Sequence, residues 1–567
     1  MSRSAPRAGR GDDRRSTPRG ARALVAAGAV ALLGGLHASP AVAAAPAGVP
    51  VINVSSTPGL AEGEETVSSN PANPDDVVVG SNQWAPPAQG NPGNIALGPD
   101  GVTSCAVFDS HDGGRTWHGR RLGTAGFGPV TLPTPQIGPT FHEFQDLGNL
   151  ISADQNTVWD RFGNLYYQCI YAGLGHGDPQ VWVFRSRDQG RTWEGPVVAF
   201  DEVSTGVQID RSFLAVDTSG GPRDGSLYLT FETMFYQPAP AAVYVRSTAG
   251  RDWTNWGPAS EARRVDDPAH EAQWDPRQYP LVGSDGVLHV AYDAAPPTTS
   301  PAPVDSSTPS IYLASSADGG VTFTHSLVDA AVSRVAGQDE AYSYFQELIS
   351  AVAVDLSNPR HVAVAWPDSG SGEDRILLRS SADGGVTWSA RQDLADDPRG
   401  SGNEHDHVAL SYMPGGTLLA VWRDRRFSGG ALTAPFDVFL RTGRQGPAGV
   451  ALGSVLRLTT SPQPPTTGHR GSMPSEYIAV SGDASGAHVS WDQLGPDGVL
   501  PDNVYAHVLV AQLPTPPGSA TGQAGGGSSL PNTGAGAVAV AAAALLGTLL
   551  PVAAGRGRRR RRSRVGP

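Results

Sequence analysis

The sequence predicts an all-β protein in which one β-propeller, with seven blades favoured and six possible, occupies residues 44–512. Three observations predict this fold. A short motif recurs at intervals of about one propeller blade. Apolar residues alternate with the period of β-strands, and Gly and Pro separate the apolar runs. No long segment shows the apolar stripe of an amphipathic helix.

The recurring motif has the form Ser-x-Asp-x-Gly-x-Thr-Trp. Its four good copies begin at Ser110, Ser186, Ser316 and Ser381, and a degenerate copy begins at Ser247. An Asp at a tight turn accepts hydrogen bonds from nearby backbone N–H groups, and Gly supplies positive φ. We therefore interpret the motif aspartates as turn-forming residues rather than catalysts. These aspartates are Asp112, Asp188, Asp318 and Asp383.

Each motif ends a longer unit that contains three expected strands, for example 212–217, 227–231 and 242–246. Two further units, toward the end of this region, have the strands without the motif. The count is seven units, and repeated units of three or four strands in one chain form a β-propeller. A spare strand at 51–54 is expected to complete the last blade and close the ring.

The motif resembles the Asp box of sialidase-like proteins, also called BNR-repeat proteins. This resemblance implies a β-propeller, although familiar sialidases have six blades. It also implies a site in which three Arg bind the sugar carboxylate, Glu activates a Tyr nucleophile, and an Asp serves as acid and base. Because secreted proteins of several functions carry Asp boxes, the motif indicates the architecture more specifically than the activity.

The candidate site is expected on the face of the propeller opposite the Asp boxes. There the first strand of each blade begins and the second ends, so loop residues at these points surround the channel mouth. Arg211 and Arg277 precede Gly220 and Gly286 by the same number of residues in consecutive units. Two guanidiniums are therefore expected side by side, and guanidiniums bind carboxylates through paired hydrogen bonds.

Position then suggests a sialidase-like set of residues. The predicted substrate-binding residues are Arg211, Arg277, Arg423 and Arg425, and the predicted catalytic residues are Tyr477, Glu476, Glu347, Asp210 and Asp275. A solvated polar rim is the alternative, because loops are usually polar. Residues 404–407, Glu-His-Asp-His, could hold a metal, but neighbouring residues of a strand point to opposite sides. We expect no metal or cofactor, with bound calcium left open.

Residues 1–43 indicate a secretory signal peptide. They combine an Arg-rich start, a short apolar run and the small-residue cleavage site Ala-Val-Ala at 41–43. A first transmembrane helix is the alternative. The chain is therefore expected outside the cytoplasmic membrane, where Cys105 and Cys169 could form one disulfide or remain two buried thiols.

The carboxyl end carries a Pro-, Gly- and Ser-rich linker at 513–529, expected to be disordered. An apolar segment at 535–554, predicted as a membrane helix, precedes an Arg-rich cytoplasmic tail at 555–567. Between the linker and the apolar segment lie Leu530, Pro531, Asn532, Thr533 and Gly534. This order resembles the sortase signal LPxTG, which implies cleavage after Thr533 and attachment to the peptidoglycan of a Gram-positive cell wall. A tail-anchored membrane protein is the alternative.

The composition excludes some partners. The chain has 41 basic residues, all of them Arg, against 54 acidic residues. This negative balance argues against nucleic acid and anionic membranes as partners. The expected partners are sortase, peptidoglycan and a glycan, and the chain is expected to be monomeric.

The sequence thus predicts a wall-anchored surface protein whose propeller is a glycoside hydrolase of the exo-sialidase kind, acting on acidic glycans. One alternative is a non-catalytic propeller that binds glycan or protein, as an adhesin or lectin does. Another is a structural surface protein. The sequence lacks the Arg-Ile-Pro motif that supplies the first Arg of sialidases, which favours binding, whereas the pair Arg211 and Arg277 favours the enzyme.

Overall fold

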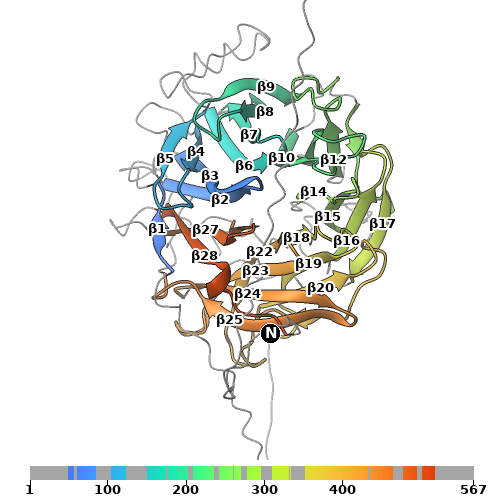
Figure 1. The fold of residues 1–567 in the computed structure, drawn as a ribbon. Helices are drawn as coiled ribbons and strands as arrows, with labels where there is room; N and C mark the ends of the chain where they lie inside the picture. The colour runs from blue at the N-terminus through green and yellow to red at the C-terminus, as the bar shows by residue number, and fades with distance from the viewer. Residues whose placement is uncertain are drawn as a thin grey trace, which may run out of the picture. The chain divides into compact units, whose positions relative to one another are not determined.

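The computed structural model confirms an all-β chain arranged as a seven-bladed β-propeller (Figure 1). Seven four-stranded antiparallel sheets follow one another around a ring, and each innermost strand contacts those of the two neighbouring sheets. The seventh blade contacts the first, so the ring is closed. The structure describes residues 49–55, 61–84, 104–122, 150–173, 177–201, 208–234, 242–258, 261–269, 278–294, 309–330, 332–333, 351–431, 434–463, 477–494 and 501–517.

Each blade runs from an inner first strand to an outer fourth strand. Blades 1 to 3 comprise β2 (Ala61–Asn70), β3 (Asn73–Trp84), β4 (Ser104–Ser110), β5 (His118–Arg121), β6 (Leu150–Trp159), β7 (Leu165–Gly173), β8 (Gly177–Ser186), β9 (Glu194–Asp201), β10 (Gln208–Val216), β11 (Leu227–Met234), β12 (Ala242–Ser247) and β13 (Arg263–Arg264). Blades 4 and 5 comprise β14 (Pro280–Val282), β15 (Leu288–Ala294), β16 (Ser310–Ser316), β17 (Thr324–Asp329), β18 (Ala351–Val354), β19 (Val362–Asp368), β20 (Arg375–Ser381) and β21 (Gln392–Asp393). Blades 6 and 7 comprise β22 (His405–Met413), β23 (Thr417–Asp424), β24 (Asp437–Gly446), β25 (Gly449–Arg457), β26 (Ala479–Gly482), β27 (Gly486–Leu494), β28 (Pro501–Leu509) and β1 (Val51–Asn53).

The blades pack face to face through apolar side chains. Every residue of β15 and of β19 is buried, because a neighbouring blade covers each face of these second strands. Burial on both faces explains why such strands consist of nearly continuous apolar runs. Trp366, Trp422 and Trp491, on the second strands of blades 5, 6 and 7, are at most 1% exposed.

The ring closes through the spare strand that the sequence predicted. The strand β1 pairs antiparallel with β28, with Val51 opposite Ala506 and Asn53 opposite Val504. Asn53 Nδ2 also donates a hydrogen bond to Asp502 Oδ2 at 2.6 Å. The last blade is therefore built from both ends of the propeller region.

The predicted signal peptide, sorting motif, apolar segment and Arg-rich tail lie outside the described residues, as does the predicted linker from residue 518 on, so these predictions stay predictions. The first residues of that linker, 513–517, are described, and the Pro514 carbonyl accepts a hydrogen bond from the Thr442 hydroxyl of the propeller. Among the residues that are described, no helix is long and apolar enough to cross a membrane. One short 3₁₀ turn, Val510–Gln512, follows the last strand of the propeller.

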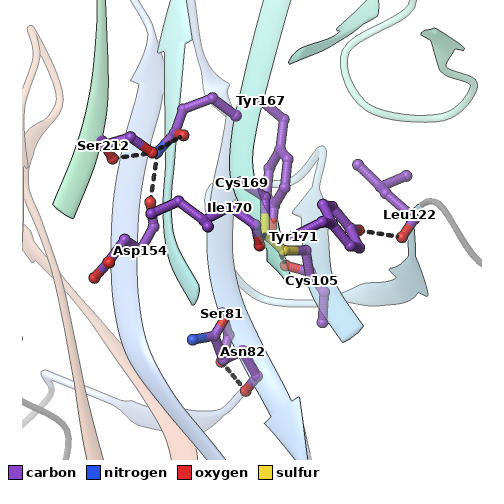
Figure 2. The surroundings of a disulfide bond; sticks show 12 residues. Ser81, Asn82, Cys105, Leu122, Asp154, Tyr167, Cys169, Ile170, Tyr171 and Ser212 are labelled. Atoms are coloured by element: carbon purple, nitrogen blue, oxygen red, sulfur yellow. Dashed lines mark hydrogen bonds between the residues drawn. A yellow bond between two sulfur atoms is a disulfide. The ribbon is translucent and has the colours of Figure 1, made fainter. Parts of the chain in front are cut away.

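A disulfide joins Cys105 on β4 to Cys169 on β7, so it links blades 1 and 2 (Figure 2). The sequence had left two free thiols as the alternative. Two hydrogen bonds reinforce the link: Tyr171 Oη donates to the Leu122 carbonyl at 2.6 Å, and Tyr167 Oη donates to the Ala106 carbonyl at 3.1 Å. Closing a loop with a sequence separation of 64 restricts the unfolded chain, an effect typically worth about 4 kcal/mol.

The Asp boxes are turns held by their aspartates. In the fourth box, Asp383 Oδ1 accepts hydrogen bonds from the backbone N–H groups of Val386 and Thr387 and from Ser381 Oγ, at 2.7–3.1 Å. Its Oδ2 accepts the Thr387 hydroxyl at 2.6 Å. Burial acts to raise the pKa of Asp383, but these hydrogen bonds outweigh it and lower the pKa to about 2. The carboxylate is thus a structural acceptor.

We predict that Asp383→Ala destabilises the fold without changing the opposite face. The substitution removes the acceptor of four hydrogen bonds, so the free energy of unfolding should fall by about 1–3 kcal/mol. Urea unfolding at neutral pH measures this loss. Unchanged stability, or a large loss of ligand affinity in protein that remains folded, would contradict the structural role.

Candidate functional site

Bulges interrupt the inner strands on the face opposite the Asp boxes. The pairing of the first and second strands shifts register between Gly63 and Thr66 in β2, and between Ala153 and Asn156 in β6. It shifts again between Asp210 and Phe213 in β10, and between Asp406 and Val408 in β22. A bulge leaves residues unpaired in the ladder and turns their side chains in new directions. The inner strands of blades 1, 2, 3 and 6 therefore each carry a bulge that can direct side chains toward a site on this face.

Three of these bulges contain a left-handed residue. Asp154 has φ 52°, Arg211 has φ 49° and His407 has φ 48°. In the described chain, the other non-glycine residue with positive φ is Gln189, which replaces a glycine of the second Asp box. Such conformations cost about 1–3 kcal/mol each and are often kept at functional sites. The strained backbone therefore makes Asp154 and Arg211 candidate site residues.

Residues from two other blades donate hydrogen bonds to the Asp154 side chain. Its Oδ1 accepts a hydrogen bond from Tyr477 Oη, and its Oδ2 accepts the backbone N–H of Arg211 at 3.0 Å. Asp154 belongs to blade 2, Arg211 to blade 3, and Tyr477 precedes the first strand of blade 7. Phe213 lies beside this group, with its ring centroid 6.1 Å from that of Tyr477. Asp154 and Arg211 are 4% exposed, and Tyr477 is 1% exposed.

The structure thus places two predicted residues, Tyr477 and Arg211, on a carboxylate that the sequence analysis had missed. A signal was present: Asp154 precedes the turn glycine Gly163 by the same number of residues as Arg211 precedes Gly220. Asp210 pairs with Glu232 of β11 in the strand ladder. The remaining predicted residues of the set lie outside the described chain, namely Glu476, Glu347, Asp275 and Arg277.

The predicted binding residues Arg423 and Arg425 surround a different carboxylate. Arg423 Nε lies 3.1 Å from Asp406 Oδ1, and Arg425 Nη2 lies 2.9 Å from Asp406 Oδ2. Burial acts to raise the pKa of Asp406, but the two guanidiniums, with His407, hold it well below its usual range. Any acidic ligand would have to share these arginines with Asp406.

The carboxyl group of Asp374, whose pKa is raised, lies near this ion cluster. Burial raises the pKa of Asp374 to about 8, and the negative charges of Glu404 and Asp406 add to the shift. Glu404 Oε2 also accepts the backbone N–H of Asp374. Asp374 can therefore hold a proton at neutral pH, which is the state that a general acid requires.

His405 forms the center of a second charged group, between blades 5 and 6. Its Nε2 lies 3.2 Å from Asp397 Oδ1 and 3.1 Å from Asp424 Oδ2, a grouping with the spacing of a metal site. Its Nδ1 lies 2.7 Å from the Asp374 carbonyl, which makes Nδ1 a donor. The two carboxylates bind guanidiniums as well, Asp397 that of Arg375 at 3.1 Å and Asp424 that of Arg426 at 2.7 Å.

These contacts favour an imidazolium over a metal ion at His405. Two guanidiniums already neutralise the carboxylate oxygens that a metal would need, and positive charge beside a cation site is unfavourable. Burial acts to lower the pKa of His405, but hydrogen bonds to Asp397 and Asp424 raise it to about 9. The residues of segment 404–407, which the sequence analysis considered as a metal site, thus belong to separate groups: His405 contacts Asp397 and Asp424, and Asp406 contacts Arg423.

The chain is a seven-bladed β-propeller with Asp-box turns, in which bulge residues of blades 2 and 3 meet Tyr477 from the start of blade 7. No protein-family model matches the chain, and no curated protein sequence matches it. Solved structures with a similar arrangement include a Hadza microbial sialidase, at 15% identity and TM-score 0.37 over 64% of this chain and 63% of that one. A mutant Trypanosoma rangeli sialidase with trans-sialidase activity is similar at 12% identity and TM-score 0.38, over 64% and 55%.

A further similar structure is an α-L-arabinofuranosidase from Fusarium graminearum, at 13% identity and TM-score 0.37, over 72% of this chain and 97% of that one. The chain spans about three fifths of the length of the sialidases that it matches.

We predict that His405 makes stability fall at alkaline pH. Its folded pKa of about 9 lies above the unfolded value of about 6.5, so its stabilisation is complete below pH 6.5 and is lost as pH rises through 9. The loss should approach about 3 kcal/mol. Urea unfolding of wild type and His405→Gln at several pH values from 6 to 10 measures it. If both proteins show the same pH dependence, His405 is not the buried cation described here.

Proposed function

We propose that the inner-strand face binds and processes an acidic glycan, in the manner of a sialidase-like glycoside hydrolase. The observation that carries the proposal is the convergence of Tyr477, Asp154 and Arg211 from three blades. A tyrosyl oxygen hydrogen-bonded to a carboxylate is the pairing that an activated tyrosine nucleophile needs. The guanidinium of Arg211, the residue whose backbone N–H binds Asp154, would suit a sugar carboxylate, because its planar fork donates two parallel hydrogen bonds.

In this proposal the roles are distinct. Asp154 takes the proton of Tyr477 as the tyrosyl oxygen forms a bond with the anomeric carbon of the sugar. The departing oxygen takes up a proton from solvent water as the glycosidic bond breaks. Water then releases the sugar from Tyr477. Arg211 holds the sugar carboxylate.

A non-catalytic glycan-binding propeller is the second candidate function. One observation favours it: Tyr477 is 1% exposed, so its oxygen meets a sugar only after neighbouring side chains move aside. In this case the same face would hold an acidic glycan without cleaving it. The two candidates differ in whether Tyr477 is needed for turnover or only for the shape of the site.

The proposal includes the cellular location of the protein. Residues 530–534, with the apolar and Arg-rich segments after them, support sortase attachment to the wall of a Gram-positive bacterium. Fractionation of cells checks it: the protein should appear with wall fragments released by muramidase. Its recovery only from the medium or the membrane would contradict wall attachment.

We predict that site variants separate binding from turnover. Arg211→Ala removes a charge-assisted contact worth roughly 1.5–3 kcal/mol, so affinity for sialyllactose should fall by one to two orders of magnitude. Arg211→Lys should weaken binding too, because it keeps the charge but loses the fork. Tyr477→Phe should abolish cleavage of an aryl sialoside and leave binding intact. Calorimetry and fluorescence of the released aryl alcohol measure the two effects.

The matched control is Arg263→Ala, which removes an exposed arginine from the outermost strand of blade 3. It should bind and cleave as wild type does. A wild type that binds but never cleaves would select the second candidate. A wild type that neither binds nor cleaves acidic glycans would end the proposal.

A further inference from the structure

Gln168 on β7 links the two strained bulges of blades 2 and 3. The side chain is fully buried. Its Nε2 donates hydrogen bonds to two backbone carbonyls, that of Asp154 and, at 2.6 Å, that of Ser212. Its Oε1 accepts the Ser212 hydroxyl at 2.8 Å. Both N–H groups and the oxygen of one amide therefore lie between the residues that carry the candidate site.

A second buried glutamine performs a related task on blade 4. Gln278 Nε2 donates to the Arg211 carbonyl at 2.6 Å, and the Gln278 carbonyl accepts the Thr230 hydroxyl at 2.6 Å. The backbone carbonyls of Arg211 and Ser212 thus each accept a hydrogen bond from a side-chain amide. Bulge residues lose their regular ladder partners, so these amides supply donors that the strands do not.

The backbone beneath Gln168 is fixed to the neighbouring blade. Cys169, the next residue, forms the disulfide with Cys105 of blade 1, and Tyr167 on the other side donates to the Ala106 carbonyl at 3.1 Å. Figure 2 shows Asp154 and Ser212 close to this disulfide-bearing strand. Because the residues on both sides of Gln168 are anchored to blade 1, the Gln168 side chain can fix the position of the groups that it binds.

We infer that Gln168 is a positioning residue, which sets the place of the Asp154 carboxylate and of Arg211 relative to Tyr477. Gln168 binds backbone carbonyls and not the groups that would meet a ligand. Its planar amide holds the two bulges at one spacing, and this keeps Asp154 in the left-handed conformation that directs its carboxylate to Tyr477 and Arg211. The inference rests on the proposed function only where ligand binding is measured, and its structural part stands apart from that function.

The test compares Gln168→Leu with a matched control, Asn156→Leu. Asn156 also joins blades 2 and 3, because its Nδ2 donates to the Leu214 carbonyl and its Oδ1 accepts the Leu214 N–H, both at 2.9 Å. Both variants remove a buried amide that makes interblade hydrogen bonds, so both should lower the unfolding temperature. The contacts of Asn156 lie beyond the bulges, so its loss should leave Asp154 in place.

Crystal structures of both variants give the first readout, which does not depend on activity. In Gln168→Leu, Asp154 should leave positive φ and lose its contacts with Tyr477 and with the Arg211 N–H. In Asn156→Leu, both contacts should remain. An unchanged Asp154 in Gln168→Leu, or the same displacement in both variants, overturns the inference.

Affinity for 3′-sialyllactose, measured well below the unfolding temperatures, gives the second readout. Gln168→Leu should bind at least ten-fold more weakly than wild type, and Asn156→Leu within three-fold of it. Displacement of Asp154 with unchanged affinity would support the positioning role and contradict the proposed binding at this face. If Gln168→Leu does not fold, Gln168→Glu replaces it: its carboxylate repels the two carbonyls at neutral pH, and protonation at lower pH should restore part of the affinity. No recovery at lower pH would overturn the inference.

Discussion

Closure of the ring is the constraint on which the rest of the structure depends. The pairing of β1 with β28 gives blade 7 its fourth strand, and the contacts of β26, β27 and β28 with β2 give every blade a neighbour on both faces. Apolar strands such as β19 are stable only because both of their faces are covered. Closure also brings Tyr477 to Asp154, although the two residues are 323 positions apart in the chain. The candidate site therefore exists only in the closed propeller.

The parts of the fold that depend on local patterns could be predicted from the sequence. Strand alternation, turn glycines and the Asp boxes are local, so the blades, their number and the closing strand were predicted, as were Tyr477 and Arg211 as site residues by position. Asp154 was missed because a bulge is set by the hydrogen-bond register between two strands, which a single strand does not reveal. The pairing of Arg423 and Arg425 with Asp406 and the disulfide likewise depend on three-dimensional proximity, which the sequence left open.

Arginine has two roles in the described chain. Between blades 5 and 6, Arg375 is buried and Arg426 is half-buried, and both bind carboxylates and so help to hold the blades together. At the bulge of blade 3, Arg211 owes its position to strained backbone that buried amides support. Strain held in place by a rigid surround is the usual sign of a site under functional constraint. The strained backbone at Arg211 is the reason why the proposed function gives ligand binding to this residue.

A crystal structure with bound N-acetylneuraminic acid tests the central claim most directly. The account predicts that the sugar lies at the inner-strand face, with its carboxylate within hydrogen-bond distance of the Arg211 guanidinium and its ring beside Tyr477. A sugar bound on the Asp-box face or at the outer strands, with the Asp154 contacts to Tyr477 and Arg211 untouched, would contradict it, as would an empty inner-strand face at saturating sugar concentration.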